Sequence, residues 1–174
     1  MSLVLAADER ALAAGGDGKA MAMRIVAESA RLLGASRLLP IASAHIDGGL
    51  YHGDSGTLFA ERLVAEGARV AVRATLNVGS LDLAGGCRVR LDEPQRGMAR
   101  RMMRAYVALG CEPSWTCAPY QAGHRPARGQ DVAWGESNAV VFCNSVLGAR
   151  TSRYGDFLDI ACAVAGRAPD CGLH

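Results

Sequence analysis

A short apolar segment, Leu38 to Ala44, is followed by a helical pattern and a second apolar segment, and this order limits the possible folds most strongly. The helical pattern covers Thr57 to Glu66 and ends before Gly67, a residue type that commonly follows a helix. Val70 to Val72 then predicts the second strand. Because strand, helix and strand in this order are typical of a parallel crossover unit, the sequence predicts an α/β fold.

The remaining elements follow the same rules. Lys19 to Leu33 alternates apolar and polar residues at helical spacing and stops at Gly34. Pro94 favours the first turn of a helix that runs to Leu109. We expect residues 1–174 to form one domain, or part of one. Its further elements are an extended segment at Pro113 to Cys117 and helices at Asn138 to Leu147 and Tyr154 to Ala165.

Composition and charge argue against several classes of protein. The formal net charge is only +2 and no long basic run occurs, so a nucleic-acid surface is not expected. No apolar run approaches the roughly 20 residues that cross a bilayer, and the N-terminus lacks the basic region of a signal peptide. We therefore expect a cytoplasmic protein without membrane contact, whose six cysteines are reduced.

Polar segments that contain glycine follow the predicted strands. They read IDGGLYHGDSG after the first strand, TLNVGSLD after the second and CAPYQAGHRP after the third. The carboxyl ends of parallel strands meet at one edge of a sheet, and open α/β sheets bind ligands beyond that edge. The sequence therefore predicts a pocket at this edge.

Two interpretations of the first polar segment remain open. The sequence HGDSG at His52 to Gly56 could bind a carboxylate or phosphate through backbone N–H groups at the start of a helix. Alternatively it is a plain loop in which Asp54 or Ser55 caps the helix. In the same way, His45 and Asp47 are either a general base with its orienting carboxylate or turn residues that bind the backbone.

Small polar side chains interrupt an apolar run between Trp134 and Thr151. Packing alone rarely selects them, because a buried amide or hydroxyl costs free energy unless it finds a partner. Cys143 in this run and Cys117 at a predicted strand end could each meet a metal or a substrate, or could be buried packing thiols. We predict that the run lines a site; its polar members include Glu136, Ser137, Asn138, Asn144, Ser145, Arg150 and Thr151.

Four motifs resemble the aconitase X family. They are AHIDG at Ala44 to Gly48, TLNVGSLD at Thr75 to Asp82, TCAPY at Thr116 to Tyr120, and WGESNAVVFCNSVLGARTSRYGDFLDI from Trp134 onward. The HGDSG and CAPYQAGHRP segments are similar to the bacterial type, which dehydrates cis-3-hydroxy-L-proline. The resemblance implies a hydro-lyase that removes water from a hydroxy acid, here giving pyrroline-2-carboxylate. It also implies an iron-sulfur cluster, whose iron acts as a Lewis acid and whose ligands are thiolates.

The resemblance implies roles for individual residues. Cys117 and Cys143 would be two ligands of the iron-sulfur cluster. The catalytic group would be His45, Asp47, Glu136 and Ser137. The substrate would be bound by His52, Ser55, Asn138, Asn144, Ser145, Arg150 and Thr151, with Arg150 suited to a bidentate carboxylate contact.

The resemblance is to the N-terminal portion of the family's catalytic domain, so a small swivelling domain or subunit of the same enzyme is the expected partner. Gly49 stands where the family has a cysteine, a departure that weakens cluster ligation. Three alternatives remain open. They are a dehydratase of a phosphorylated mevalonate, a non-catalytic fragment that associates with a partner subunit, and a cysteine hydrolase in which His45 or His124 activates Cys117 or Cys143.

Overall fold

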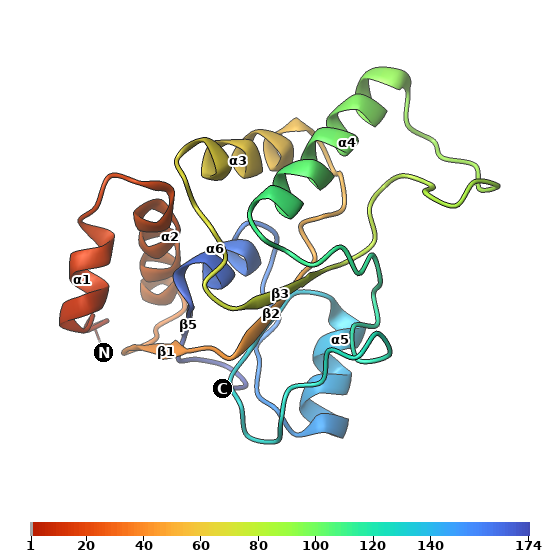
Figure 1. Cartoon of the computed structure of the whole chain (residues 1–174). Coiled ribbons are helices and arrows are strands. Elements are labelled where there is room, and N and C mark those ends of the chain that lie inside the picture. The colour runs from red at the N-terminus through yellow and green to blue at the C-terminus, as the bar shows by residue number, and fades with distance from the viewer. Residues whose placement is uncertain (1) are drawn as a thin grey trace.

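A three-stranded parallel sheet lies at the centre of the computed structural model, which describes residues 2–174 (Figure 1). Its strand order is β3-β2-β4, with β2 at Ser43–Ile46, β3 at Arg73–Leu76 and β4 at Ala133–Trp134. Single parallel bridges extend the sheet on both sides, because Glu112 pairs with Thr75 and Arg153 pairs with Trp134. Five chain segments therefore end at one edge of the sheet, and the predicted α/β class is confirmed.

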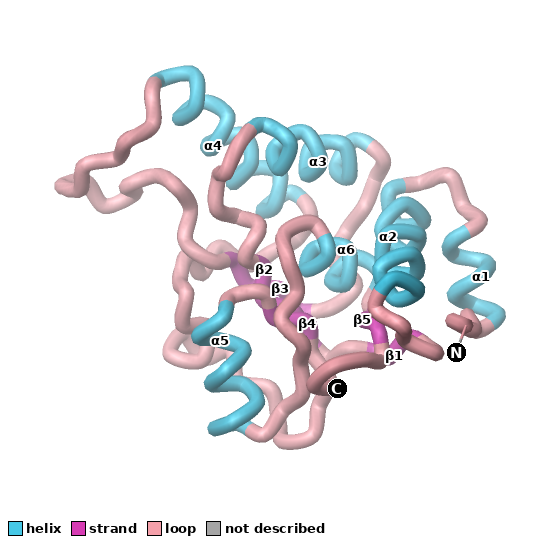
Figure 2. The backbone as a smooth tube through the Cα atoms, turned by 180° about the vertical axis from the view of Figure 1, so that it is seen from behind, coloured by secondary structure: helices cyan, strands magenta, loops and turns pink. Residues whose placement is uncertain are grey.

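Helices cover both faces of the sheet (Figures 1 and 2). On one side α6 packs on β2 and β4, α2 packs on α6, and α3 packs on α4. In both views α5 lies on the other side. The helices are α1 (Ala7–Ala13), α2 (Gly18–Leu32), α3 (Asp54–Ala65), α4 (Glu93–Ala108), α5 (Ser137–Phe142) and α6 (Leu158–Ala165); α5 continues into a π-helix at Cys143–Leu147.

Local sequence signals account for several of these helices. The Asp17 side chain accepts the N–H of Ala20 at the start of α2, within one residue of the predicted boundary. Asp92 and Gln95 form a capping box at the start of α4. Every residue of α6 from Asp159 to Ala165 is buried, as its position between the sheet and α2 requires. No helix within residues 2–174 has the length and apolar character needed to cross a membrane.

The predicted strand Leu38 to Ala44 is in fact divided between two sheets. β1 (Leu38–Pro40) pairs antiparallel with β5 (Arg167–Pro169), and the central strand β2 begins only at Ser43. Pro40 explains the break, because a proline cannot donate to a continuing ladder of hydrogen bonds.

Two further predicted strands were wrong. Val70 donates its N–H to Leu109 and Ala71 donates to Ala163, so Val70 to Val72 is bound to helix ends and β3 begins at Arg73. Pro113 to Cys117 contains no strand, because Pro113 lacks the N–H that would continue the pairing begun by Glu112.

Two helices begin at other residues than predicted. α3 begins three residues earlier than predicted, and α6 begins at Leu158 rather than Tyr154.

Between β3 and α4, residues 78–92 extend away from the sheet (Figures 1 and 2). We call these residues the arm.

Candidate functional site

Three polar residues meet at the carboxyl edge of the sheet. Asp47 follows β2, Asn77 follows β3 and Glu136 lies one residue beyond Gly135 after β4. The amide nitrogen of Asn77 donates to Oδ1 of Asp47 at 2.5 Å and to Oε2 of Glu136 at 2.7 Å. We call these three residues the edge cluster. Two carboxylates held by one buried amide are suited to paired acid and base chemistry.

Asp159 supports this cluster from below and was missed by the sequence analysis. Its carboxylate accepts the N–H groups of Asp47 at 2.7 Å and Gly48 at 3.0 Å, and it also accepts the N–H of Ile160. Burial raises the pKa of Asp159 to about 7 in spite of these hydrogen bonds. The available signal was one carboxylate in the otherwise apolar helix DFLDIACAVAG.

The carboxyl group of Asp47 is harder to ionise than an ordinary aspartate. Burial is the main cause of its raised pKa, and the charges of Glu136 and Asp156 add to the effect. The hydrogen bond from Asn77 and the nearby charge of Arg153 act in the opposite direction. The sequence analysis also missed Arg153. This residue pairs with Trp134 at the end of β4, so a search for polar residues at strand ends could have found it.

Cys117 lies close to the edge cluster, whereas Cys143 is in an apolar environment. The Asn138 amide donates to the carbonyl oxygen of Cys117 at 2.9 Å, and burial followed by the charge of Glu136 raises the pKa of the Cys117 thiol. Cys143 is fully buried beside Trp134 and other apolar residues, and burial raises its pKa to about 12. The structure therefore does not give the two predicted cluster ligands a common environment.

His45 is a buried residue below the edge. Its Nδ1 lies 2.9 Å from Oγ1 of Thr75, whose other contact is Nδ1 of His124 at 2.8 Å. Burial lowers the pKa of His45 to about 3 and that of His124 to about 4. Within residues 2–174 no hydrogen bond joins His45 to Asp47, so the predicted pairing of base and orienting carboxylate is not formed.

The HGDSG segment lines a small cavity of about 80 Å³ beside the edge cluster. His52 and Ser55 contribute to its wall together with Tyr106 and Asp156. The expectation that Asp54 or Ser55 caps α3 is wrong, because Gly53 is the N-cap and no side chain caps this helix. Asp54 instead accepts a hydrogen bond from the hydroxyl of Tyr51 at 2.7 Å.

Ser137, on the other side of the edge, donates its hydroxyl and its N–H to Glu136.

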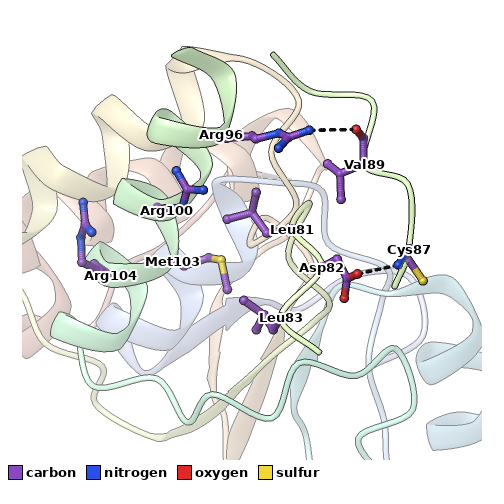
Figure 3. Close-up of a pocket in the computed structure, with 9 residues that line it drawn as sticks. All are labelled: Leu81, Asp82, Leu83, Cys87, Val89, Arg96, Arg100, Met103 and Arg104. Atoms are coloured by element: carbon purple, nitrogen blue, oxygen red, sulfur yellow. Dashed lines mark hydrogen bonds between the residues drawn. The ribbon is translucent and has the colours of Figure 1, made fainter. Parts of the chain in front are cut away.

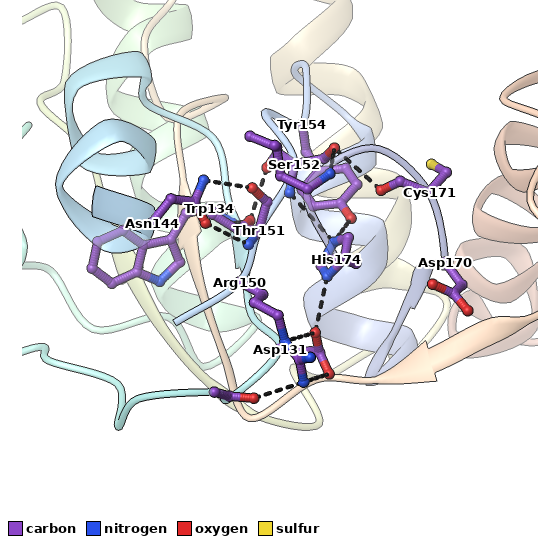
Figure 4. A network of polar contacts seen from close by, with 12 residues as sticks. Asp131, Trp134, Asn144, Arg150, Thr151, Ser152, Tyr154, Asp170, Cys171 and His174 are labelled. Atoms are coloured by element: carbon purple, nitrogen blue, oxygen red, sulfur yellow. Dashed lines mark hydrogen bonds and ion pairs between the residues drawn. The ribbon is translucent and has the colours of Figure 1, made fainter. Parts of the chain in front are cut away.

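Asn144, Arg150 and Thr151, which were also predicted to bind substrate, belong to a separate network (Figure 4). Asn144 and Thr151 exchange two hydrogen bonds through the Asn144 amide and the Thr151 backbone. Arg150 forms an ion pair with Asp131 at 3.2 Å instead of facing the edge cluster. Because the bridge between Asp131 and Arg150 precedes the one between Trp134 and Arg153, this pair lies at the amino end of the sheet. Ser145 is exposed on the π-helix.

A hollow of about 500 Å³ between the arm and α4 contains none of the predicted site residues (Figure 3). Its apolar lining includes Leu81, Leu83 and Met103. Arg96 on α4 donates to the carbonyl oxygen of Val89 in the arm, so this arginine is used to hold the arm.

Comparison with known proteins identifies the family. The family model described as "Aconitase X first domain" matches residues 2–174. The chain is 49% identical to the cis-3-hydroxy-L-proline dehydratase of Pseudomonas aeruginosa, over 98% of this chain and 30% of that protein. It is 38% identical to the phosphomevalonate dehydratase large subunit of Methanothermobacter thermautotrophicus, over 91% of this chain and 40% of that protein.

A solved structure agrees with these matches. The holo-form of Thermococcus kodakaraensis aconitase X superposes with a TM-score of 0.88 at 36% identity, covering 99% of this chain and 43% of that chain. The chain thus spans less than half the length of each of these three proteins. The chain belongs to the aconitase X family, and it corresponds to the first domain of that family.

Proposed function

We propose that this chain is the first domain of a hydro-lyase that removes water from a hydroxy acid, with cis-3-hydroxy-L-proline as the substrate. The observation that carries the proposal is the edge cluster, in which Asn77 holds the carboxyl groups of Asp47 and Glu136 on one amide nitrogen. The name of the 49% identical Pseudomonas aeruginosa protein supports the choice of substrate. The activity of an enzyme longer than this chain is part of the proposal.

Elimination of water needs a base and an acid. The base takes the proton from the carbon next to the carboxylate, and the electron pair of that bond forms the new double bond. The carbon–oxygen bond then breaks, and the hydroxyl group takes a proton from the acid and leaves as water. We assign the acid to Asp47, since its raised pKa keeps the proton to a higher pH, and the base to Glu136.

Other predicted residues fit this assignment to different degrees. Asn138 lies beside Cys117, and His52 and Ser55 line the neighbouring cavity, so these three remain proposed substrate contacts. Ser137 donates to Glu136 and remains a proposed member of the catalytic group. The Nδ1 atom of His45 is engaged in its buried hydrogen bond with Thr75. We leave Asn144, Ser145, Arg150 and Thr151 out of the proposed site, because none of them is hydrogen-bonded to the edge cluster in residues 2–174.

The iron-sulfur cluster implied by the family does not fit the described residues alone. Within residues 2–174 no three side chains of Cys, His, Asp or Glu are placed to hold a metal ion. Cys117 is a partly exposed thiol near the edge, while Cys143 is buried in apolar surroundings. After treatment with iron and sulfide we expect no visible charge-transfer band. A band that is lost in Cys117→Ala and Cys143→Ala would contradict this expectation.

A second dehydratase function has specific support, because the Methanothermobacter relative is named as a phosphomevalonate dehydratase large subunit. That name also supports a partner subunit for this chain, such as the expected small swivelling domain or subunit. A cysteine hydrolase has no such support, because within residues 2–174 neither Cys117 nor Cys143 is hydrogen-bonded to a histidine.

The test is a chimera in which this chain replaces the matching 30% of the Pseudomonas aeruginosa cis-3-hydroxy-L-proline dehydratase. We expect the chimera to dehydrate cis-3-hydroxy-L-proline and to leave mevalonate 5-phosphate unchanged. The variant Asn77→Ala in this chimera should lose most of the activity, because the two carboxyl groups would lose the amide that holds them. A folded chimera without dehydration would refute the proposal.

A further inference from the structure

The arm and α4 border a groove that runs along one face of α4. The hollow of about 500 Å³ between the arm and the helix is its first part, and a second hollow of about 340 Å³ extends to Trp115 (Figure 3). Met103 and Arg104 line both hollows, so they form one groove, which we call the α4 groove. From Arg96 to Ala108 the helix rises by about 18 Å, which is enough to hold about three turns of another helix.

The lining of the α4 groove is largely apolar, and part of it is open to solvent. Leu83 of the arm is 61% exposed and Val107 of α4 is 43% exposed. Met103 and the half-buried Trp115 line the groove with them. Tryptophan, methionine and arginine are enriched at the centres of protein interfaces, and gathered exposed apolar side chains mark surfaces that another molecule covers. The composition of the groove therefore indicates a polypeptide partner.

Positive charge surrounds this apolar lining. Residues 78–108 contain six arginines and three acidic residues, although the net charge of the whole chain is only +2. The acidic side chains already bind the arm backbone, the start of α4 and Arg100; they are Asp82, Asp92 and Glu93. In contrast, Arg88, Arg90 and Arg104 form no ion pair or side-chain hydrogen bond within residues 2–174. These free guanidinium groups select an acidic partner.

The position of the groove connects it with the proposed site. The arm begins at Val78, directly after Asn77 of the edge cluster. A segment held between the arm and α4 is therefore anchored beside the carboxyl edge of the sheet. Small-molecule sites commonly lie where two domains meet, so this is a suitable place for another part of the same enzyme to attach.

We propose that the α4 groove holds an acidic amphipathic helix that belongs to the part of the enzyme outside these 174 residues. The apolar face of that helix packs on Leu83, Met103 and Trp115, and its carboxylates face Arg104. The chain spans only 30% of the Pseudomonas aeruginosa relative, so a longer enzyme has ample sequence to supply the helix. This inference rests on the proposed function in that the chain is the first domain of a longer hydro-lyase, and it adds the surface that binds the rest.

Hydrogen–deuterium exchange followed by mass spectrometry tests the contact in the chimera and in the 174-residue chain. The N–H groups of Leu83, Arg88 and Arg90 form no hydrogen bond within residues 2–174, so they exchange rapidly in the isolated chain. We expect peptides of the arm to exchange about tenfold more slowly in the chimera, because the docked helix covers them. Equal exchange in the two proteins would overturn the inference. Protection that rises with the concentration of the isolated chain would also overturn it, because a second copy would then be the occupant.

Charge reversal identifies the occupant. Arg104→Glu places a carboxylate four residues after Arg100, a spacing that suits a helix, so α4 is kept while the groove loses its free charge. In the chimera this variant should return exchange of the arm to within about twofold of the isolated chain. One peptide outside the first domain should lose protection with it, and this peptide should be acidic with apolar residues at helical spacing. Retained protection of the arm, or loss of protection in a basic segment instead, would contradict the inference.

Arg69→Glu is the matched control for charge reversal. Arg69 is an exposed arginine outside the groove, and it bonds only to the neighbouring carbonyl oxygen of Ala68. This variant should leave the arm and the acidic peptide protected. If it removed the protection as Arg104→Glu does, the effect would come from the total charge of the domain and the groove would not be the docking surface.

A dye tests the groove in the isolated chain, should the chimera fail to fold. Anilinonaphthalene sulfonate combines an apolar ring system with one negative charge, as the proposed occupant does. We expect its fluorescence to rise on binding to the 174-residue chain, and its affinity to fall about fivefold in Arg104→Glu and in Leu83→Ser. Arg69→Glu should bind the dye like the wild type. No binding, or unchanged binding in both groove variants, would show that the groove does not have this chemistry.

The chimera separates this inference from the proposed function. An active chimera with an unprotected arm would refute the docking surface and leave the dehydratase function standing. A folded but inactive chimera with a protected arm would refute the function and leave the docking surface standing.

Discussion

Aspartate occurs at both ends of the parallel sheet, but the surroundings of its carboxyl group differ between the two ends. At the amino end Asp131 forms an ion pair with Arg150 at 3.2 Å and a hydrogen bond with His174 at 3.3 Å. At the carboxyl end Asp47 and Asp159 share a region with Glu136, and burial raises the pKa of both aspartates. A fold that needed only stability would neutralise both ends, so the accumulated carboxyl groups point to chemistry at the carboxyl end.

The largest expected effect is on catalysis. Glu136→Gln in the chimera should lower kcat about 1,000-fold, because a neutral amide cannot accept the proton that the base removes. Asp131→Asn should leave kcat within about twofold, since it alters only the amino end of the sheet. Steady-state rates of cis-3-hydroxy-L-proline dehydration measure both. An equal loss in the two variants would mean that the comparison between the two ends does not reflect catalysis.

Cysteine reactivity should show a similar contrast. At pH 8 iodoacetamide should modify Cys117 at least 100-fold faster than Cys143, because burial raises the pKa of Cys143 to about 12 and keeps the reagent away. The exposed Cys87 is an internal reference for a reactive thiol. Mass spectrometry of digested samples over time measures the rates. Rapid modification of Cys143 in the folded chain would restore it as a candidate ligand or nucleophile.

Sequence patterns predicted the parts of the molecule that depend on neighbours in the chain. The α2 and α4 boundaries came from spacing and end signals, and both lie within one residue of the structure. The strand-end rule also brought the segments that contain Asp47 and Asn77 to one edge, although the expected positions of two strands were wrong. Glu136 was predicted separately, from the polar run that begins after Trp134. An edge position tolerates such errors, because it depends on where strands end and not on their length.

Long-range contacts explain what the sequence did not reveal. Asp159 binds the N–H groups of Asp47 and Gly48, which are more than 100 residues earlier, and no local pattern encodes that contact. Arg150 was expected at the site because it belongs to a polar run with Glu136. The π-helix and the turn after it instead return the chain to the amino end of the sheet, where Asp131 is the partner.

Asp159 should make folding stability depend on pH in the opposite direction from a typical aspartate. Its pKa is about 7 in the folded chain and about 3.8 when unfolded, so between these values the folded state binds the proton more tightly. Stability should therefore fall as the pH rises from about 4 to about 7. Asp159→Asn cannot titrate, and its slope should be less negative by up to about 1.4 kcal/mol per pH unit. Urea unfolding followed by circular dichroism measures both slopes, and parallel curves would rule out a raised pKa for Asp159.

The smallest expected effect is at the amino end, where the charges are already paired. Asp131→Asn should lower the free energy of unfolding by about 1 kcal/mol at neutral pH, because half-exposed Arg150 loses an ion pair that water partly replaces. Glu93→Gln, which breaks a more exposed ion pair with Arg100, should leave the urea midpoint unchanged. If Asp131→Asn instead stabilised the chain, the charge of Asp131 at the amino end would also lower the folding stability. Carboxyl groups that cost stability would then occur at both ends of the sheet, and they would no longer distinguish the carboxyl end, where we place the chemistry.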